Sequence, residues 1–183
     1  MNFFQRFWGH LRTVQKHRKA VRKLCFKCGL YWQGLTHDLS KYSPTEFWLG
    51  VKYYTGTASP HVGERKDKGY SEAWLHHHNR NKHHAEYWVD IIEGRSQHIR
   101  MPYKYFAEML CDRIAASMVY LKDKYTDNAP LDYFLSHQAE NRFHPDVREE
   151  LEIALEWLAQ HGQEDFFKKL KVYLDNDEGW DIQ

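Results

Sequence analysis

Residues 29–47, GLYWQGLTHDLSKYSPTEF, contain the end of one helix and the start of the next. The two glycines of this stretch weaken the helical pattern that precedes it. The SPTE run at residues 43–46 predicts a new helix, because serine caps the first turn and proline fits the first helical position. His37 and Asp38 lie between these two signals, next to a predicted helix end.

Helical periodicity extends on both sides of this stretch. Before it, apolar residues recur at three- and four-residue steps from Phe7 to Cys28, and Lys and Arg fill the other face. After it, we expect helices at about residues 44–54, 71–93 (interrupted or strained near 79–81), 102–121, 146–160 and 164–174, with a loop over 55–70. We find no strand and no repeat. The sequence therefore predicts an all-α fold of six or seven helices that ends in a helical hairpin.

Length and composition exclude several classes of protein. A chain of 183 residues with 42% hydrophobic and 28% charged residues has the size of one domain and is not a disordered tail. No apolar run approaches the roughly 18 residues of a membrane span, and the start, MNFFQRFWGHLR, lacks the apolar core of a secretory signal. We therefore expect a cytoplasmic protein without a membrane partner. Three cysteines suit a reducing compartment, and we expect Cys25 and Cys28 to be core residues.

Charge is distributed unevenly along the chain. Residues 1–36 carry eight Lys or Arg and no acid, whereas residues 145–183 carry eleven Asp or Glu against four Lys or Arg. Two complementary helices that pack against each other would explain this pattern, and so would an anionic partner at the basic end. We favour the first explanation.

Histidines and aspartates form the pattern that suggests chemistry. Nine of the thirteen histidines lie between residues 10 and 84. One histidine on an amphipathic helix is usually a core or solvent-facing residue, but His17, the His37-Asp38 doublet, the cluster at 76–84 and Asp112 come from separate helical segments. Imidazole and carboxylate together suit divalent first-row metals. Adjacent side chains point in different directions on a regular helix, so they can converge on one ion only near a helix end. The His37-Asp38 doublet lies next to such an end.

Helical geometry selects among the clustered histidines. If residues 71–93 form one helix, His77 and His78 flank its apolar face and His84 lies on the edge of that face. We hold His83 back as a ligand for the case in which the helix breaks at residue 79. Asn81 lies at the centre of the same face, where a buried polar side chain needs a partner.

Two resemblances to known families rest on these residues. The order His, His-Asp, His, His, Asp on an all-α chain resembles the HD-domain superfamily of metal-dependent phosphohydrolases. HDLSK, residues 37–41, is similar to the His-Asp-x-Gly-Lys signature of that superfamily, with Ser40 where glycine is common. More narrowly, GLYWQGLTHDLSKYSPTEF, AWLHHHNRNKHHAEYW and MPYKYFAEMLCDRIAA are similar to a bacterial and phage family catalogued only as a domain of unknown function, over residues 10–125.

The HD resemblance implies a domain organisation and a site. Residues 1–125 would form an HD-like helical bundle, with residues 126–183 as a helical extension on the same domain. One or two divalent ions (Mn, Fe, Co, Ni or Zn) would bind to His17, His37, Asp38, His77, His78, His84 and Asp112, with Asp38 as a bridge. Asp38 and Lys41 would be catalytic, and the substrate phosphate would contact Lys41, Arg80, Asn81 and Lys82. Arg65, Lys66 and Lys68 of the expected loop could form a lid.

These observations lead to one preferred function and two alternatives. We expect a phosphohydrolase that acts on a nucleotide or another small phosphate ester. One alternative keeps the metals and replaces hydrolysis by di-iron oxygenase chemistry. The other is a non-catalytic binding protein whose basic first helix contacts nucleic acid or a partner protein. No base-reading motif is visible, so we disfavour nucleic acid as that partner, and a homo-oligomer stays open.

Overall fold

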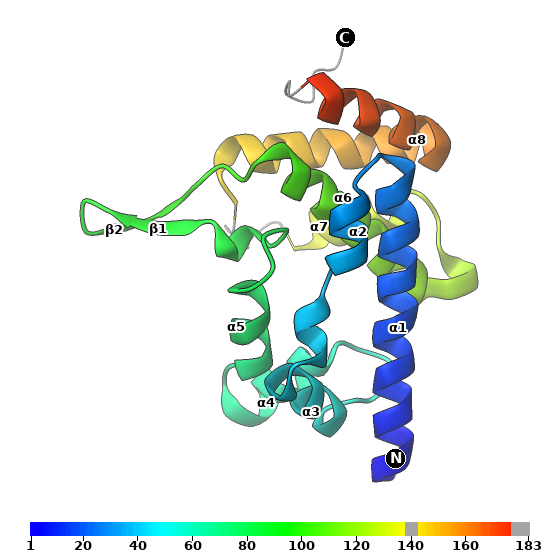
Figure 1. The fold of residues 1–183 in the computed structure, drawn as a ribbon, viewed down its shortest axis with the longest axis vertical. Coiled ribbons are helices and arrows are strands. Elements are labelled where there is room, and N and C mark those ends of the chain that lie inside the picture. Colours follow the sequence, from blue (N-terminus) through cyan, green and yellow to red (C-terminus); the bar gives the residue numbers. More distant parts are fainter. Residues whose placement is uncertain (138–142, 177–183) are drawn as a thin grey trace.

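The protein is described by a computed structural model for residues 1–137 and 143–176, and it is mostly α-helical (Figure 1). Within these residues the α-helices are α1 (Phe3–Lys27), α2 (Tyr31–Thr36), α3 (Pro44–Lys52), α4 (Pro60–Lys68), α5 (Glu72–His78), α6 (Tyr103–Leu121), α7 (Ala129–Ser136) and α8 (Pro145–Asn176). Short 3₁₀ helices are η1 (Leu39–Tyr42), η2 (Ala85–Tyr87) and η3 (Lys122–Lys124), and the strands are β1 (Val89–Ile92) and β2 (Arg95–His98). The all-α prediction is confirmed apart from one small hairpin. No helix in these ranges has the length and apolar character needed to cross a membrane.

Helix α1 is the long helix that the periodicity predicts. It begins with a capping box in which the Asn2 side chain accepts a hydrogen bond from the Gln5 amide at 2.9 Å and the Gln5 side chain accepts one from the Asn2 amide at 3.0 Å. It buries one face, on which Val14 and Val21 lie, against α6 and α2. Its end coincides with Gly29, whose φ of +83° is accessible to glycine without strain.

The hydrophobic core lies where α1, α6 and α8 meet, in the upper half of Figure 1. Leu110 of α6 and Leu155 of α8 are both inaccessible to solvent. The core therefore contains residues from both the predicted bundle, 1–125, and the predicted C-terminal extension, 126–183. Cys25 and Cys28 lie in the same core as free thiols, which confirms their interpretation as packing residues.

Helix α8 contains a break that turns it into a hairpin. Gly162 has a φ of +76° and a ψ of +171°, which no regular helix contains. The Asp127 carboxylate accepts a hydrogen bond from the Gln163 amide at 3.1 Å and so satisfies a donor at the start of the second half. The predicted C-terminal hairpin is confirmed (Figure 1). Residues 177–183 of the predicted extension lie outside the described part of the chain.

The segment 55–70, predicted as a loop, contains α4 instead. Its carboxylate Glu64 is buried and accepts hydrogen bonds from the Ser71 hydroxyl at 2.7 Å and from the Ala73 amide at 3.3 Å. These bonds fix α4 against the start of α5. Lys68 pairs with Glu64 at 3.1 Å, so it belongs to this junction. The predicted loop is therefore wrong over residues 60–68, and the lid of Arg65, Lys66 and Lys68 stays a prediction.

The predicted helix over 71–93 is also wrong in its second half. Helix α5 ends at His78, and the Asn81 side-chain amide donates to the His77 backbone carbonyl at 2.7 Å, as polar side chains do at the ends of helices. The chain continues into the β1–β2 hairpin, whose first strand, VDII, is rich in the β-branched residues that favour extended structure. Glu93 and Gly94, with φ of +53° and +74°, form its turn. The prediction that the chain has no strand is wrong here.

The basic and acidic ends of the chain meet without pairing their charges. Helices α1 and α8 are in contact, and the Lys27 ammonium lies 5.1 Å from the centre of the Phe167 ring. No salt bridge joins α1 to α8 within the described residues. Glu150 and Asp146 of α8 pair with Arg100 instead. The charge complementarity that we favoured is therefore not observed.

Candidate metal centre

The His37-Asp38 doublet lies in a sharp change of backbone direction. His37 caps the C-terminus of α2, and Asp38 adopts the left-handed conformation, with φ +54° and ψ +29°, before η1 begins. The Arg18 guanidinium donates to the His37 carbonyl at 2.7 Å and helps to hold this turn in place. The two side chains approach each other, with His37 Nε2 and Asp38 Oδ2 separated by 3.4 Å. The side chains of the doublet thus converge at a helix end, as predicted.

The four residues predicted as first-metal ligands come together from three parts of the chain. His17 of α1 places Nε2 2.8 Å from Asp112 Oδ1 of α6 and 3.8 Å from Asp38 Oδ2. His37 Nε2 lies 3.5 Å from Asp112 Oδ1. His17, His37 and Asp38 offer ligand atoms within 4.8 Å of one another and could hold a metal ion.

A second group shares Asp38 with the first. His77 Nε2 and His83 Nε2 lie 3.3 and 3.5 Å from Asp38 Oδ1, whereas the histidines of the first group approach Oδ2. Asp38, His77, His83 and His84 also present ligand atoms within 4.8 Å of one another and could hold a metal ion. The two oxygens of Asp38 therefore face different histidines.

One histidine enters the cluster and another stays outside it. His83 is buried and belongs to the second group, although the helical pattern pointed it away from the apolar face. His78 belongs to none of the ligand groups found within residues 1–137 and 143–176, and its ring lies 5.8 Å from that of Trp74. His83 follows the end of α5 at His78, and beyond that residue helical positions no longer determine where a side chain points.

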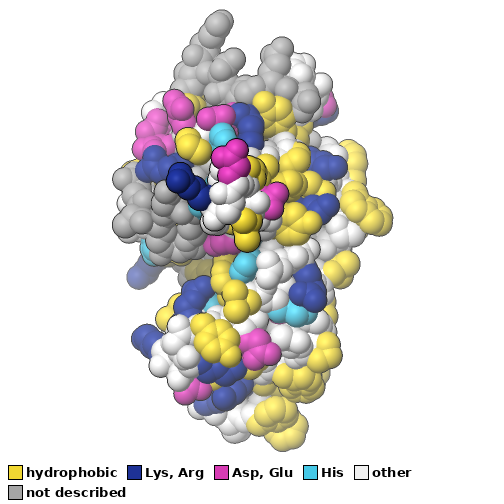
Figure 2. Space-filling view, turned by 90° about the vertical axis from the view of Figure 1, so that its left-hand side faces the viewer, with side chains coloured by type: hydrophobic (Ala, Val, Ile, Leu, Met, Phe, Trp, Pro, Cys, Tyr) yellow, Lys and Arg dark blue, Asp and Glu magenta, His cyan; other side chains and the backbone are white. Residues whose placement is uncertain are grey.

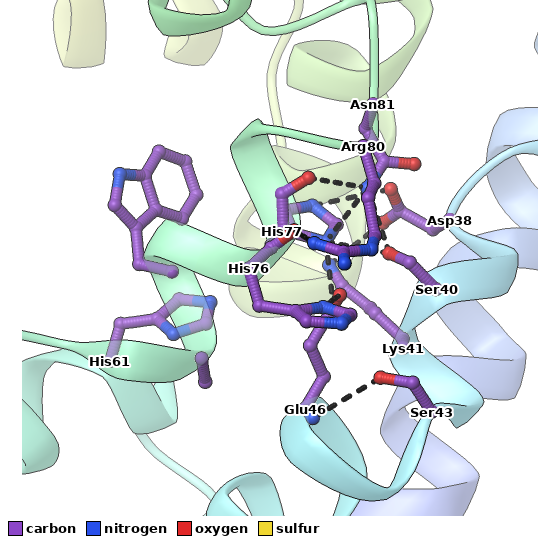
Figure 3. Close-up of polar contacts among 12 residues, drawn as sticks. Asp38, Ser40, Lys41, Ser43, Glu46, His61, His76, His77, Arg80 and Asn81 are labelled. Atoms are coloured by element: carbon purple, nitrogen blue, oxygen red, sulfur yellow. Dashed lines mark hydrogen bonds and ion pairs between the residues drawn. The ribbon is translucent and has the colours of Figure 1, made fainter.

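Buried carboxylates contact the histidine rings of the cluster at Nδ1, the ring nitrogen that does not face Asp38. Glu108 Oε1 lies 2.8 Å from His37 Nδ1 and 3.1 Å from His83 Nδ1. Glu46 Oε2 lies 2.8 Å from His77 Nδ1, and its Oε1 lies 2.7 Å from His76 Nδ1 (Figure 3). An ionised carboxylate only accepts, so each of these Nδ1 atoms donates. When the rings of His37, His77 and His83 are neutral, the lone pair is then on Nε2, the atom that faces Asp38.

The two supporting glutamates were not predicted as site residues. Glu46 was expected to complete a capping box, but only one half of that motif forms, in which Ser43 Oγ accepts from the Glu46 amide at 3.3 Å. Its carboxylate turns to His76 and His77. Glu108 precedes Asp112 by one helical turn, and this spacing was the available signal, because residues four apart share a helix face.

Several buried atoms at the centre of the cluster form no hydrogen bond. They are Nε2 of His37, His77, His83 and His84, and Oδ1 of Asp38. Buried polar atoms are rarely left without a partner, and those that are call for an explanation such as an ion. Imidazole nitrogens with a carboxylate bonded to the other ring nitrogen are the usual form of metal-bound histidine. The donor set therefore fits a divalent metal.

The charges around Asp38 and Asp112 favour the ionised form of both carboxylates, which is the form that binds a metal. Burial tends to raise the pKa of Asp38, but the neighbouring His37 and Lys41 outweigh it and hold that pKa well below its usual range. Burial also tends to raise the pKa of Asp112, but the neighbouring His17 and His37 outweigh it and hold that pKa well below its usual range. Both carboxylates are thus ionised at neutral pH.

The pKa values of His77 and His84 are shifted in one direction and that of His37 in the other. Burial lowers the pKa of His77, and burial together with the neighbouring His83 and His77 holds the pKa of His84 well below its usual range, so both rings are neutral. Burial also opposes the charge on His37, but Asp38 and Asp112 outweigh it and raise the pKa of His37 well above its usual range. A metal would compete with that proton, because metal ligation requires the neutral ring.

A cavity of about 610 Å³ adjoins the cluster, and the predicted substrate-contacting residues differ in their relation to it. Lys41 lines the cavity, and its ammonium lies 2.7 Å from Asp38 Oδ2. Arg80, Asn81 and Lys82 are not among its lining residues. The exposed Arg80 donates to the His76 carbonyl, and Asn81 donates to Ser40 Oγ at 2.8 Å.

Comparison with known proteins places the chain in a family without giving it a reaction. A family model described as "Family of unknown function (DUF5662)" matches residues 6–156, which include every member of the two ligand groups, and the chain belongs to this family. No curated protein and no solved structure matches the chain. The predicted uncharacterised family is therefore confirmed.

Proposed function

We propose that this member of the family is a metal-dependent phosphohydrolase of the HD type that acts on a nucleotide or another small phosphate ester. The observation that carries the proposal is the convergence of unbonded, buried Nε2 atoms on the two oxygens of Asp38. An aspartate that faces two ligand groups is the arrangement that a dinuclear centre requires. The order of these residues along the chain also resembles that of the HD superfamily.

His17, His37, Asp38 and Asp112 would hold the first ion. Asp38, His77, His83 and His84 would hold the second, with Mn, Fe, Co, Ni and Zn all suited to this mixture of imidazole and carboxylate. Divalent ions at these positions would supply Lewis acidity, which lowers the pKa of a coordinated water and polarises a phosphoryl oxygen. His78, which we predicted as a ligand from the helical pattern, is not part of this proposal.

Lys41 supports a phosphate substrate in particular. Its ammonium lies beside Asp38 and lines the cavity, so it could neutralise charge on a bound phosphate. Burial opposes this charge, but Asp38 and Asp112 outweigh it and raise the pKa of Lys41, so that the cation persists at neutral pH. Glu46 and Glu108 act as positioning residues, because each accepts a hydrogen bond from Nδ1 of a proposed ligand histidine and so orients its ring.

Elemental analysis of protein purified without chelator tests the centre. We expect two equivalents of divalent metal in the wild type and loss of both in Asp38→Asn. His83→Ala and His78→Ala form a matched pair, since the first should lose the second ion and the second should keep both. No metal after reconstitution, or equal metal loss in the two histidine variants, would contradict the proposed centre.

A turnover assay tests the reaction separately. Metal-loaded protein should hydrolyse p-nitrophenyl phosphate or a member of a nucleotide panel, and Asp38→Asn should reduce kcat by about 10³-fold, or ~4 kcal/mol. His161→Ala, which changes an exposed histidine stacked on Trp157, is the control and should keep full activity. Metal-loaded protein that hydrolyses none of these esters would overturn the hydrolase assignment. Oxygen consumption by the ferrous form would then favour the oxygenase alternative.

A further inference from the structure

Four large aromatic side chains are exposed together at one end of the molecule. Phe3, Phe4 and Trp8 of α1 and Trp48 of α3 expose 57%, 71%, 52% and 51% of their surface. We call these four residues the aromatic tip. Figure 2 shows hydrophobic side chains at the lower end of the molecule, where Figure 1 places the start of α1 and α3. Patches of this kind mark interaction sites.

The tip is an ordered surface. The Phe3 ring stacks on Trp48 with ring centres 6.5 Å apart, and Phe7 meets Trp8 edge-on at 5.2 Å. Beneath them, Phe7 contacts Phe47 at 5.4 Å, so the exposed rings rest on a packed layer. The aromatic groups are thus held in place before any partner binds, which reduces the entropic cost of docking.

Positive charge runs along α1 from this tip. Arg12, Lys16, Lys19 and Lys23 recur at three- and four-residue steps and are all exposed, so they form one stripe on the outward face of α1. Residues 1–36 contain no Asp or Glu to neutralise it. Across the neighbouring helices, the exposed Asp67 is already paired with Lys52 at 3.6 Å.

We propose that the aromatic tip and this basic stripe dock the protein on an anionic lipid surface. Trp and Phe favour the boundary between lipid headgroups and acyl chains, and basic residues beside them are attracted to anionic lipids. This is peripheral docking, and it differs from the expectation of no membrane partner. The proposal is independent of the metal centre.

Two other partners fit this surface less well. Single-stranded nucleic acid is held by aromatic rings that alternate with cations along a groove, but here the aromatic tip lies at one end of α1 and the stripe follows on an outward helix face. A second copy bound through the same face would bring two basic stripes together, since a two-fold interface pairs identical patches. Like charges would oppose that contact.

Vesicle co-sedimentation tests the proposal, with the full-length protein and vesicles of phosphatidylcholine alone or with about one third phosphatidylglycerol. We expect binding to the anionic vesicles only. Each cation near the surface contributes about fivefold to affinity, so Arg12→Gln/Lys16→Gln should weaken binding at least tenfold. Phe4→Ser/Trp8→Ser should weaken it at least as much.

Matched controls separate docking from unfolding and from general charge. Trp32→Ser removes an aromatic residue that is 73% exposed on α2, and Lys124→Gln/Lys171→Gln removes two exposed cations outside α1. Both should bind vesicles like the wild type. All variants change exposed side chains, so their thermal unfolding should match that of the wild type.

Three results would overturn the proposal. The first is no preference for anionic vesicles at low salt, or a tip variant that binds as well as Trp32→Ser. The second is binding to a 30-nucleotide single strand that depends on Arg12 and Lys16 while vesicles do not compete. The third is dimerisation, seen by light scattering, that is lost in Phe4→Ser/Trp8→Ser without any vesicle binding by the wild type.

Discussion

Helices α1 and α6 each contribute to two buried regions of opposite chemistry. In the hydrophobic core, Leu24 of α1 and Leu110 of α6 pack with Leu155 of α8. In the metal centre proposed above, His17 and Asp112 of the same two helices meet the histidine–aspartate doublet. The same pair of helices thus contributes to an apolar region and to a charged one.

The two regions differ in what stabilises them. Burial of an aliphatic side chain is favourable in itself, at about 25 cal/mol per Å² of apolar surface. Burial of an aspartate such as Asp38, which is 1% exposed, is unfavourable unless charges and hydrogen bonds offset it. Lys41 and the histidines offset part of this cost, but unbonded Nε2 atoms remain. The core should therefore be complete in the bare chain, whereas the cluster should be complete only with its ligand.

Removal of metal should lower the stability of the protein more than any other change considered, because it leaves the cluster without its ligand and leaves the hydrophobic core unchanged. A ligand at about 1,000 times its Kd contributes about 4 kcal/mol to folding, so a chelator should lower Tm by about 8–16 °C for a chain of this size. Differential scanning fluorimetry with and without chelator measures the shift. Asp38→Asn should show no further shift. An unchanged wild-type Tm would mean that the cluster is stable on its own hydrogen bonds.

Truncation of a side chain in the hydrophobic core should lower stability without changing the metal content. Leu155→Ala removes a side chain with no exposed surface and should cost about 3.5 kcal/mol, the middle of the range for such cavities. Urea unfolding measures the loss, and elemental analysis should find the metal content of the wild type. Metal loss in Leu155→Ala would show that the two regions fold as one unit and would break the comparison.

The sequence predicts the core far better than the cluster. Apolar residues such as Val21 and Leu24 follow the helical period, and each helix they predict in α1, α6 and α8 is present. The doublet and Asp112 were also placed correctly, because a helix end and a helix face fix them. The helix predicted over 71–93 failed because side-chain hydrogen bonds from Asn81 end α5 early, and such bonds compete with helix formation without altering the hydrophobic period.

The supporting carboxylates show why the rest of the site was missed. Glu46 lies in a sequence context that is typical of a helix cap, and its histidine partners, His76 and His77, are about thirty positions away along the chain. Only the packing of α3 against α5 brings them together. A contact of this kind has no local periodicity, so neither propensity nor spacing within one segment predicts it.

Glu108→Gln should weaken the cluster without removing a proposed ligand. The amide keeps the shape of the side chain but loses the charge that supports His37 and His83. Loss of such a partner costs about 10–100-fold in metal affinity, or ~1.4–2.7 kcal/mol. Titration with Zn²⁺ or Mn²⁺ by isothermal calorimetry measures this change. Glu149→Gln, an exposed glutamate of α8, should have no effect, and equal affinities in both variants would assign Glu108 to structure alone.

His10 is a buried histidine of α1 that lies outside the ligand groups found in the described residues. It allows a histidine buried in apolar surroundings to be compared with those of the cluster, and its expected effect on stability is the smallest of the four. Its ring lies among Phe47 and Tyr54 and against Gly50, where a side chain would collide with it. Burial, assisted by the Lys41 charge, lowers the pKa of His10 to about 4 from 6.5. The folded state therefore binds fewer protons than the unfolded state, and stability from this group falls as pH decreases below about 6.5.

The expected loss from His10 between pH 7.5 and pH 5.5 is about 1 kcal/mol. His10→Leu removes the titrating group and fills the same apolar space, so the variant should lose about 1 kcal/mol less than the wild type over this interval. Urea unfolding of chelated protein at both pH values measures the difference without a contribution from metal release. Identical pH dependence in both proteins would show that burial of this ring does not perturb its titration. A histidine that is buried without carboxylate neighbours would then titrate as it does in water. The pKa shifts in the cluster would have to come from its converging charged groups and not from burial.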